Sequence, residues 1–139
     1  MTPDKAEGFV EIEHTADISL KIWAKTLNNL FKLAVDGMNS IIEIDLDDND
    51  TGKYQKFSIQ DMDLESMLVS LLNECNYIIQ QDLICTKIMN IFVENEKITG
   101  NLFLQGIRTF RKEIKAVTYH NLKINSSTKG YSVVIVFDV

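Results

Sequence analysis

Carboxylates near the two ends of the sequence are the residues best suited to chemistry. Asp17 closes the tetrapeptide His14-Thr15-Ala16-Asp17, which interrupts the strand-like alternation of VEIEHTADISLKIWA. Asp138 follows the apolar run VVIVF and stands next to Val139, so its side-chain carboxylate is adjacent to the α-carboxylate of Val139. Two adjacent anions repel each other unless solvent or a cation offsets their charge.

A divalent cation would explain these residues if they converge. Asp17, Asp138 and the carboxylate of Val139 would form a hard oxygen site, which suits Ca²⁺ or Mg²⁺ better than zinc. A solvated tail is the alternative interpretation of the last residues, because most chain termini are of that kind. Spacing along the chain does not decide between the two.

The two histidines, His14 and His120, fall on the apolar phase of the strands that contain them. A histidine in that position is more often a hydrogen-bonded supporting residue than a metal ligand. A nucleophilic triad of Ser19, His14 and Asp17 is conceivable, but no nucleophile elbow or glycine-rich oxyanion loop surrounds it. Walker A and GxGxxG sequences are missing too, so no nucleotide site is recognised.

The acidic segment EIDLDDNDTGK resembles a calcium loop only in part. Asp45, Asp47 and Asn49 fit the first ligand positions of an EF-hand, but Asp50 replaces the glycine at position six and Lys56 the glutamate at position twelve. The mismatch at both diagnostic positions predicts a solvated surface loop.

Composition limits the class of protein. The 139 residues predict one domain spanning residues 1–139, and 45% hydrophobic residues are typical of a globular chain. Because 20 Asp and Glu outnumber 14 Lys and Arg, for a net charge of −6, direct binding of nucleic acid is disfavoured. The sequence still allows a local basic patch in residues 109–123. Cys75 and Cys85 are interpreted as buried reduced thiols.

No transmembrane run or signal-like segment is recognised, so we expect a cytoplasmic protein with no membrane partner. Apolar spacing predicts helices over residues 27–42, after Thr26 as N-cap, and over residues 64–81, after Asp63 as N-cap. Gly37 should end the first helix or mark close packing. The remaining pattern predicts about seven strands, with residues 113–125 as one of them and the last strand central in its sheet. The expected fold is an α+β sandwich of two helices on a mostly antiparallel or mixed sheet.

Four blocks of the sequence resemble the archease family. HTAD (residues 14–17), DLESMLVSLLNE (63–74), EIKAVTYHNLKI (113–124) and FDV (137–139) are similar to its HTAD, D-L-x-x-L-L-x-x-L-L-x-E, E-V-K-A-x-T-Y-H and F-D-I motifs, in the same order. The resemblance runs from about Phe9 to Val139. Ser19 and Ala24 stand where the family commonly has glycine, and residues 105–113 form a short segment that lacks the usual acidic residue and histidine.

The resemblance implies a function that the residues alone do not give. Archeases are protein cofactors, not enzymes, of the GTP-dependent RNA-splicing ligase that joins 3′-phosphate or 2′,3′-cyclic-phosphate ends to 5′-hydroxyl ends. They promote guanylylation and multiple turnover of the ligase in tRNA splicing and RNA repair, so RNA would be met only indirectly, through the ligase.

The family's residues can be placed on this sequence. The resemblance implies a divalent metal, calcium first and magnesium or manganese next, held by Asp17, Asp138 and Val139. It implies activating roles for Lys115 and Thr118, with His14 and His120 in support. Two other functions stay open: a small metal-dependent hydrolase acting on a phosphate substrate, and a chaperone-like binding module.

Overall fold

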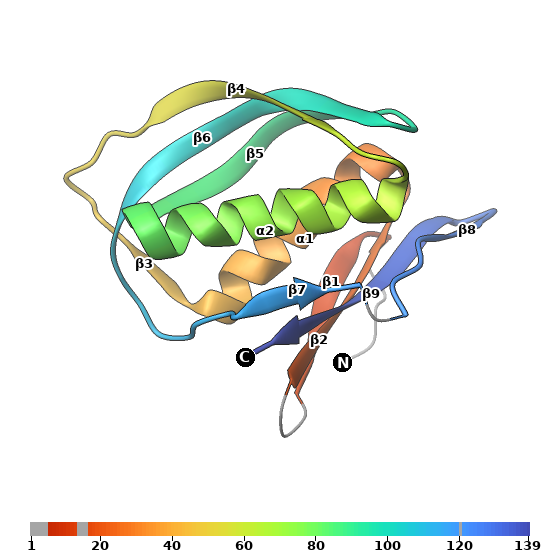
Figure 1. The fold of residues 1–139 in the computed structure, drawn as a ribbon, viewed down its shortest axis with the longest axis horizontal. Helices are drawn as coiled ribbons and strands as arrows, with labels where there is room; N and C mark the ends of the chain where they lie inside the picture. Colours follow the sequence, from red (N-terminus) through yellow and green to blue (C-terminus); the bar gives the residue numbers. More distant parts are fainter. Residues whose placement is uncertain (1–5, 14–16, 120) are drawn as a thin grey trace.

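The computed structural model describes residues 6–13, 17–119 and 121–139, which form two helices and nine strands (Figure 1). The strands make two antiparallel sheets, and the helices lie between them in Figure 1 and contact both. This is the α+β sandwich that the sequence predicts. None of the helices in the described residues is long and apolar enough to cross a membrane.

The first sheet contains five strands: β1 (Gly8–Glu13), β2 (Asp17–Ala24), β7 (Ala116–Thr118), β8 (Asn125–Ser127) and β9 (Gly130–Asp138). Its order is β1-β2-β9-β7, and β8 pairs with the start of β9. The predicted central position of the last strand is therefore confirmed. Its inward residues Val133, Ile135 and Phe137 are buried.

The second sheet is built around one long strand. It contains four strands: β3 (Ile44–Leu46), β4 (Lys53–Gln60), β5 (Ile84–Val93) and β6 (Lys97–Phe110). All three of the others pair antiparallel with β6. This sheet covers the helix surfaces that face away from β2 and β9.

Helix α1 (Leu27–Ile42) begins as predicted, because Thr26 Oγ1 accepts a hydrogen bond from the Asn29 backbone N–H at 3.1 Å. Gly37 marks close packing rather than the helix end. A Cβ atom added at Gly37 would lie 2.5 Å from Cδ2 of Leu20, which is fully buried in β2. The missing side chain thus lets α1 approach the inner face of β2.

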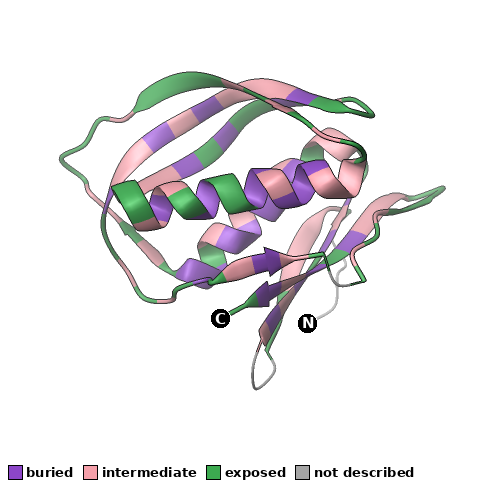
Figure 2. Ribbon diagram, in the orientation of Figure 1, coloured by how far each residue is buried: buried purple, intermediate pink, exposed green. Residues whose placement is uncertain are grey.

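Helix α2 (Leu64–Asp82) is capped by Asp63, whose carboxylate accepts a hydrogen bond from the Ser66 N–H at 2.7 Å. Its apolar face includes Leu68, Leu72 and Ile79, and it joins α1 and both sheets in one buried cluster. Figure 2 shows buried residues along the helices and alternating with exposed ones on the strands. Both helices are therefore fixed by packing on the sheets.

Two differences from the predicted elements concern short segments. The structure has nine strands in the described residues rather than about seven, because β3 and β8 contain three residues each and are too short to show alternation. Residues 113–125 are not one strand. β7 ends at Thr118, Leu122 N–H donates to Tyr119 C=O at 3.0 Å, and Asn121 adopts φ 53°, which an extended strand does not allow.

Candidate metal-binding site at the paired ends of β2 and β9

The register between β2 and β9 brings two acidic residues together from distant parts of the chain. Asp17 lies directly opposite Asp138, at the start of β2 and the end of β9 (Figure 1). Directly opposed residues of an antiparallel pair have Cβ atoms about 4.5–5.5 Å apart and share a face of the sheet. That face is the outer one, because the neighbours Ile18 and Phe137 point into the core.

At this end of the first sheet, β9 pairs with β2 on one side and with β7 on the other. Ala116 lies opposite Asp138, and the backbone N–H of Lys115 donates to the Asp138 carbonyl at 2.7 Å. The backbone of Asp138 is thus held from β2 and from the β7 segment, while its residue is exposed. The Lys115 residue is exposed as well.

Polar side chains of α2 fix the β7 segment in place. Asn76 Nδ2 and Gln80 Nε2 both donate to the Ile114 carbonyl, at 2.8 and 2.6 Å, and the Val117 N–H donates to Asn73 Oδ1 at 3.2 Å. Asn76 is only 6% exposed, so its amide is committed to this contact. Helix α2 therefore positions the strand that borders Asp138.

The sequence did not predict that these three polar residues of α2 support the site. Asn73, Asn76 and Gln80 recur at i, i+3 and i+7, so they form a polar stripe beside the apolar face of a helix. A polar stripe at that spacing usually faces solvent, and nothing local distinguishes it from one that hydrogen-bonds a neighbouring segment.

Val139 borders a shallow cavity of about 380 Å³ on the inner side of the same end, lined also by Glu13, Ile18, Lys112 and Glu113. The Lys112 ammonium lies 3.4 Å from the Glu13 carboxylate and 3.5 Å from the Glu43 carboxylate. The hydrogen bond that Lys112 donates to Glu13 raises the pKa of Lys112, so Lys112 stays charged and offsets part of the acidic charge there.

Thr118 shares the outer face with Asp17 and Asp138 but lies one row farther along the sheet. It is opposite Val136, whose other neighbour is Ser19 on β2. Its Oγ1 atom is buried and has no hydrogen-bond partner among the described residues. The structure thus places a hydroxyl with unused bonding capacity next to the carboxylate pair.

The remaining predicted site residues, His14 and His120, lie outside the described residues. Of the implied metal ligands, the register joins Asp17 to Asp138, and Val139 follows Asp138 in the chain. Within the described ranges, no cluster of three or more His, Cys, Asp or Glu side chains could hold a metal ion. The donors that remain are two side-chain carboxylates with the Val139 carboxylate, an oxygen-only set that fits Ca²⁺ or Mg²⁺.

The acidic loop after α1 is held by protein contacts. Asp50 accepts hydrogen bonds from the N–H groups of Gly52 at 2.9 Å and Gly106 at 2.6 Å, and these bonds lower its pKa. Asp45 and Asp48 lie 3.8 and 3.6 Å from the Arg108 guanidinium. The loop lies at the surface, as its mismatch with a calcium loop predicts.

Both cysteines are free thiols, as expected. Burial raises the pKa of Cys75 to about 12 and that of Cys85 to about 11, so both stay protonated at neutral pH. Cys75 is completely enclosed and Cys85 partly so. Neither thiol takes part in the site.

Comparison with known proteins gives one consistent result. The sequence model of the archease protein family (MTH1598/TM1083) matches residues 9–139. The protein archease of Methanosarcina barkeri is 32% identical over 138 residues, which cover 92% of this chain and 93% of that protein.

Solved structures agree on the fold. A crystal structure from Thermotoga maritima, described as an archease and possible chaperone, has a TM-score of 0.68 and 25% identity, and the match covers 92% of this chain and 94% of that one. The solution structure of protein 1598 of Methanobacterium thermoautotrophicum has a TM-score of 0.71 at 20% identity, with 95% and 99% coverage, which supports the fold alone. Because the family match, the relative and the paired-sheet architecture all span nearly the whole sequence, this chain belongs to the archease family.

Proposed function

We propose that this protein is a non-catalytic activator of a GTP-dependent RNA-splicing ligase. It would promote guanylylation and multiple turnover of the ligase during tRNA splicing or RNA repair, by means of a divalent ion held at the ends of β2 and β9. The observation that carries the proposal is the register pairing of Asp17 with Asp138. Membership of the archease family supports the ligase as the partner.

The residues at this end have distinct roles in the proposal. Asp17 and Asp138 lie on the outer face at the ends of two paired strands, where Asp138 is exposed to a partner protein. The ion, calcium first and magnesium or manganese next, would offset phosphate charge at the partner's nucleotide site. Lys115 and Thr118 flank the pair and are both proposed to take part in activation. Exposed Lys115 would contact the ligase, whereas the Thr118 hydroxyl is buried and would act from within the protein.

A multiple-turnover ligation assay tests the proposal. Limiting ligase is mixed with GTP, manganese and RNA bearing a 3′-phosphate or 2′,3′-cyclic-phosphate end and a 5′-hydroxyl end, with and without this protein. We expect repeated turnover only when the protein is present. Asp17→Asn and Asp138→Asn should each remove at least about 90% of the stimulation, because each removes one of few charged ligands.

The matched control is Asp82→Asn, which makes the same chemical change at an exposed carboxylate near the end of α2. It should stimulate as well as the unchanged protein. Full stimulation by both site variants would contradict the role of the metal. Phosphate release by this protein alone would indicate a hydrolase. Protection of a partner from aggregation, with site variants unimpaired, would indicate a chaperone-like module.

A further inference from the structure

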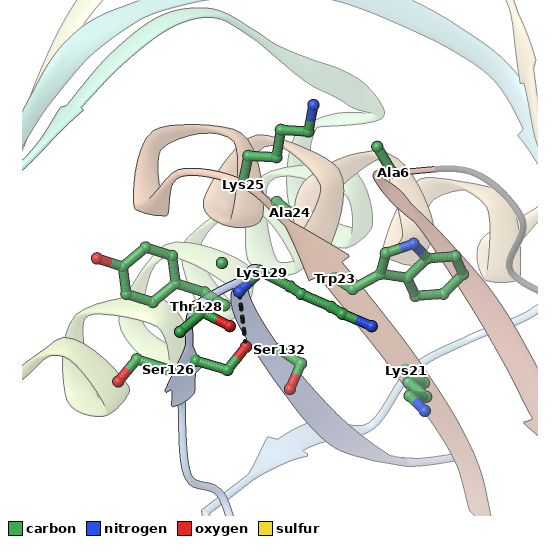
Figure 3. A pocket seen from close by; sticks show the side chains of 12 residues that line it. Ala6, Lys21, Trp23, Ala24, Lys25, Ser126, Thr128, Lys129 and Ser132 are labelled. Atoms are coloured by element: carbon green, nitrogen blue, oxygen red, sulfur yellow. Dashed lines mark hydrogen bonds between the residues drawn. The ribbon is translucent and has the colours of Figure 1, made fainter.

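A second surface feature lies at the opposite end of β2 from Asp17. A groove of about 870 Å³ opens there, between the end of β2 and the β8–β9 hairpin (Figure 3). Its walls include three lysines, Lys21, Lys25 and Lys129, with the indole of Trp23 and several Ser and Thr hydroxyls. None of the described residues that line it is an Asp or a Glu.

The charges of Lys21 and Lys129 in this groove are not offset by a carboxylate of the described residues. In the basic segment of residues 109–123, two of the cations are paired: the Arg111 guanidinium and the Lys112 ammonium lie 3.7 and 3.5 Å from Glu43, and Lys112 also pairs with Glu13. By contrast, no ion pair within 4.0 Å involves Lys21 or Lys129 among the parts of the chain that the structure describes.

Lys25 contributes less than the other two lysines. Glu7 lies near it and accepts hydrogen bonds from the Lys25 backbone N–H at 2.9 Å and from the Asn29 amide at 3.0 Å, which lower the pKa of Glu7. In Figure 3 the Lys25 side chain extends away from those of Lys21 and Lys129. The positive potential inside the groove therefore rests on Lys21 and Lys129.

The register gives Lys21 neutral neighbours. It lies on the outer face between Val10 of β1 and Val134 of β9, and the next row is Ile12, Ser19 and Val136. Val134 is 45% exposed, so apolar surface continues from the groove along the sheet. No carboxylate in register competes with an external anion at Lys21.

Lys129 is fixed by the hairpin that carries it. Its backbone N–H donates to Ser127 Oγ at 3.1 Å, and the next residue, Gly130, has φ 128°. A Cβ atom at Gly130 would lie 2.3 Å from the carbonyl oxygen of Ala24, so only glycine lets the hairpin sit against β2. The Lys129 side chain then extends across the groove toward Trp23 (Figure 3).

Trp23 is held in place by its strand neighbours. It lies between Gly8 and Ser132 in register, and a Cβ atom at Gly8 would lie 3.1 Å from Cζ2 of the indole. The ring therefore rests on the glycine backbone and remains partly exposed beside the lysines. An aromatic platform next to cations and hydroxyls binds a base and its phosphate together.

We propose that this groove binds a phosphorylated nucleoside, with the phosphate between Lys21 and Lys129 and the base against Trp23. The ligand can belong to a single-stranded RNA or be a free nucleotide, since both present the same base and phosphate. The inference does not depend on the proposed ligase activation, because the binding is measured on this protein alone.

Trp23 is the only tryptophan of the chain, so its fluorescence reports on the groove directly. The protein is titrated with a short single-stranded oligoadenylate, with ATP and with tripolyphosphate, at low and at physiological salt. We expect the oligoadenylate or ATP to quench Trp23, and tripolyphosphate to bind more weakly and to leave the emission unchanged. Tighter binding of oligoadenylate identifies a strand as the ligand, and tighter binding of ATP a free nucleotide.

Two double variants make a matched comparison. Lys21→Ala/Lys129→Ala should weaken binding about tenfold at low salt and flatten the salt dependence, because two phosphate contacts are lost. Lys56→Ala/Lys97→Ala removes the same charge from exposed lysines of the second sheet and should change affinity less than about twofold.

All four lysines are exposed, so both double variants should fold, and circular dichroism checks this. Equal weakening by both pairs would mean attraction by net charge alone and would overturn the proposal. No quenching by either nucleotide, or equally tight binding of tripolyphosphate, would overturn the contact of the base with Trp23.

Discussion

At the scale of residues, the notable feature is that two carboxylates are placed opposite each other with no cation of the protein between them in register. Asp17 and Asp138 face each other across β2 and β9, and the third residue of the row is Ala116. Like charges directly opposed across a sheet are destabilising. Lys112, a cation at this end, is engaged by Glu13 and Glu43. The pair therefore adds nothing to stability by itself, in keeping with the ion-binding role proposed for it.

Calcium should stabilise the protein, and this can be measured apart from any activity. At a calcium concentration one hundred times the dissociation constant, binding to the folded state adds about 2.7 kcal/mol to the free energy of unfolding. Asp17→Asn and Asp138→Asn should abolish this gain and, without metal, be as stable as the unchanged protein or slightly more so. Thermal unfolding with calcium or with a chelator is the measurement. A calcium-induced rise in Tm that survives in both variants would show that the ion binds elsewhere.

At the scale of elements, α2 acts as the support for β7. Asn76 and Gln80 meet at one carbonyl oxygen, that of Ile114, and a third bond joins their own amides at 3.3 Å. Because both donors come from a capped helix packed in the core, they hold the segment before β7 against a rigid element. The outer end of β9 is thereby kept between two strands.

The amides of α2 should be partly redundant. Asn76→Ala should lower the free energy of unfolding by about 1–2 kcal/mol, because Gln80 still bonds the Ile114 carbonyl. Asn76→Ala/Gln80→Ala should cost more than the sum of the single changes, since only then is that carbonyl left unsatisfied. Chemical denaturation of the four proteins gives the coupling energy. Strictly additive values would mean that the two bonds act independently.

The elements also show what a sequence can and cannot specify here. Both helices were predictable to within about two residues, because long apolar stripes and the caps Thr26 and Asp63 are local signals. The αL residue Asn121 was not, since its conformation comes from a turn that local alternation does not encode. The proximity of Asp17 and Asp138 depends on pairing between strands from opposite ends of the chain. The residues alone left this proximity open, and only the family resemblance implied it.

At the scale of the whole molecule, β2 joins two surfaces of opposite charge. Asp17 is at its start, and Lys21 and Trp23 lie on the same outer face toward its end. Six residues of extended strand place Trp23 roughly 20 Å from Asp17. The net charge of −6 therefore hides a separation of charge along one face, with the acidic end suited to a cation and the basic end to an anion.

Stability should fall in acid. Hydrogen bonds hold the pKa of Asp50 and Asp63 below their ordinary value of 3.8, and that of Glu7 below 4.5. These three carboxylates contribute to the free energy of unfolding at a pH above their ordinary pKa values. The contribution is lost as the pH falls through their lower pKa values in the folded protein. Burial raises the pKa of Asp36, whose contribution has the opposite sign and offsets part of the trend.

We therefore expect Tm to decrease as the pH is lowered from about 5 to about 3, and Asp50→Asn to show a shallower decrease. Asn keeps an acceptor for the Gly52 N–H but does not titrate. Calorimetry over this range, with Asp82→Asn as control, measures the effect. If the Tm of the Asp50→Asn variant falls as steeply as that of the unchanged protein, titration of Asp50 does not contribute to the loss of stability in acid.

The pairing of β2 with β9 also determines when, during synthesis and folding, the proposed ion site can form. During synthesis β2 leaves the ribosome long before β9, and 138 − 17 = 121 positions separate the two aspartates. Contacts between such distant segments form late, because a long loop must close first. A nascent chain thus has Asp17 without Asp138, and in a misassembled chain the two residues are not paired. The paired carboxylates exist only in a molecule whose first sheet is complete, so a partner that requires the bound ion would pass over unfinished copies.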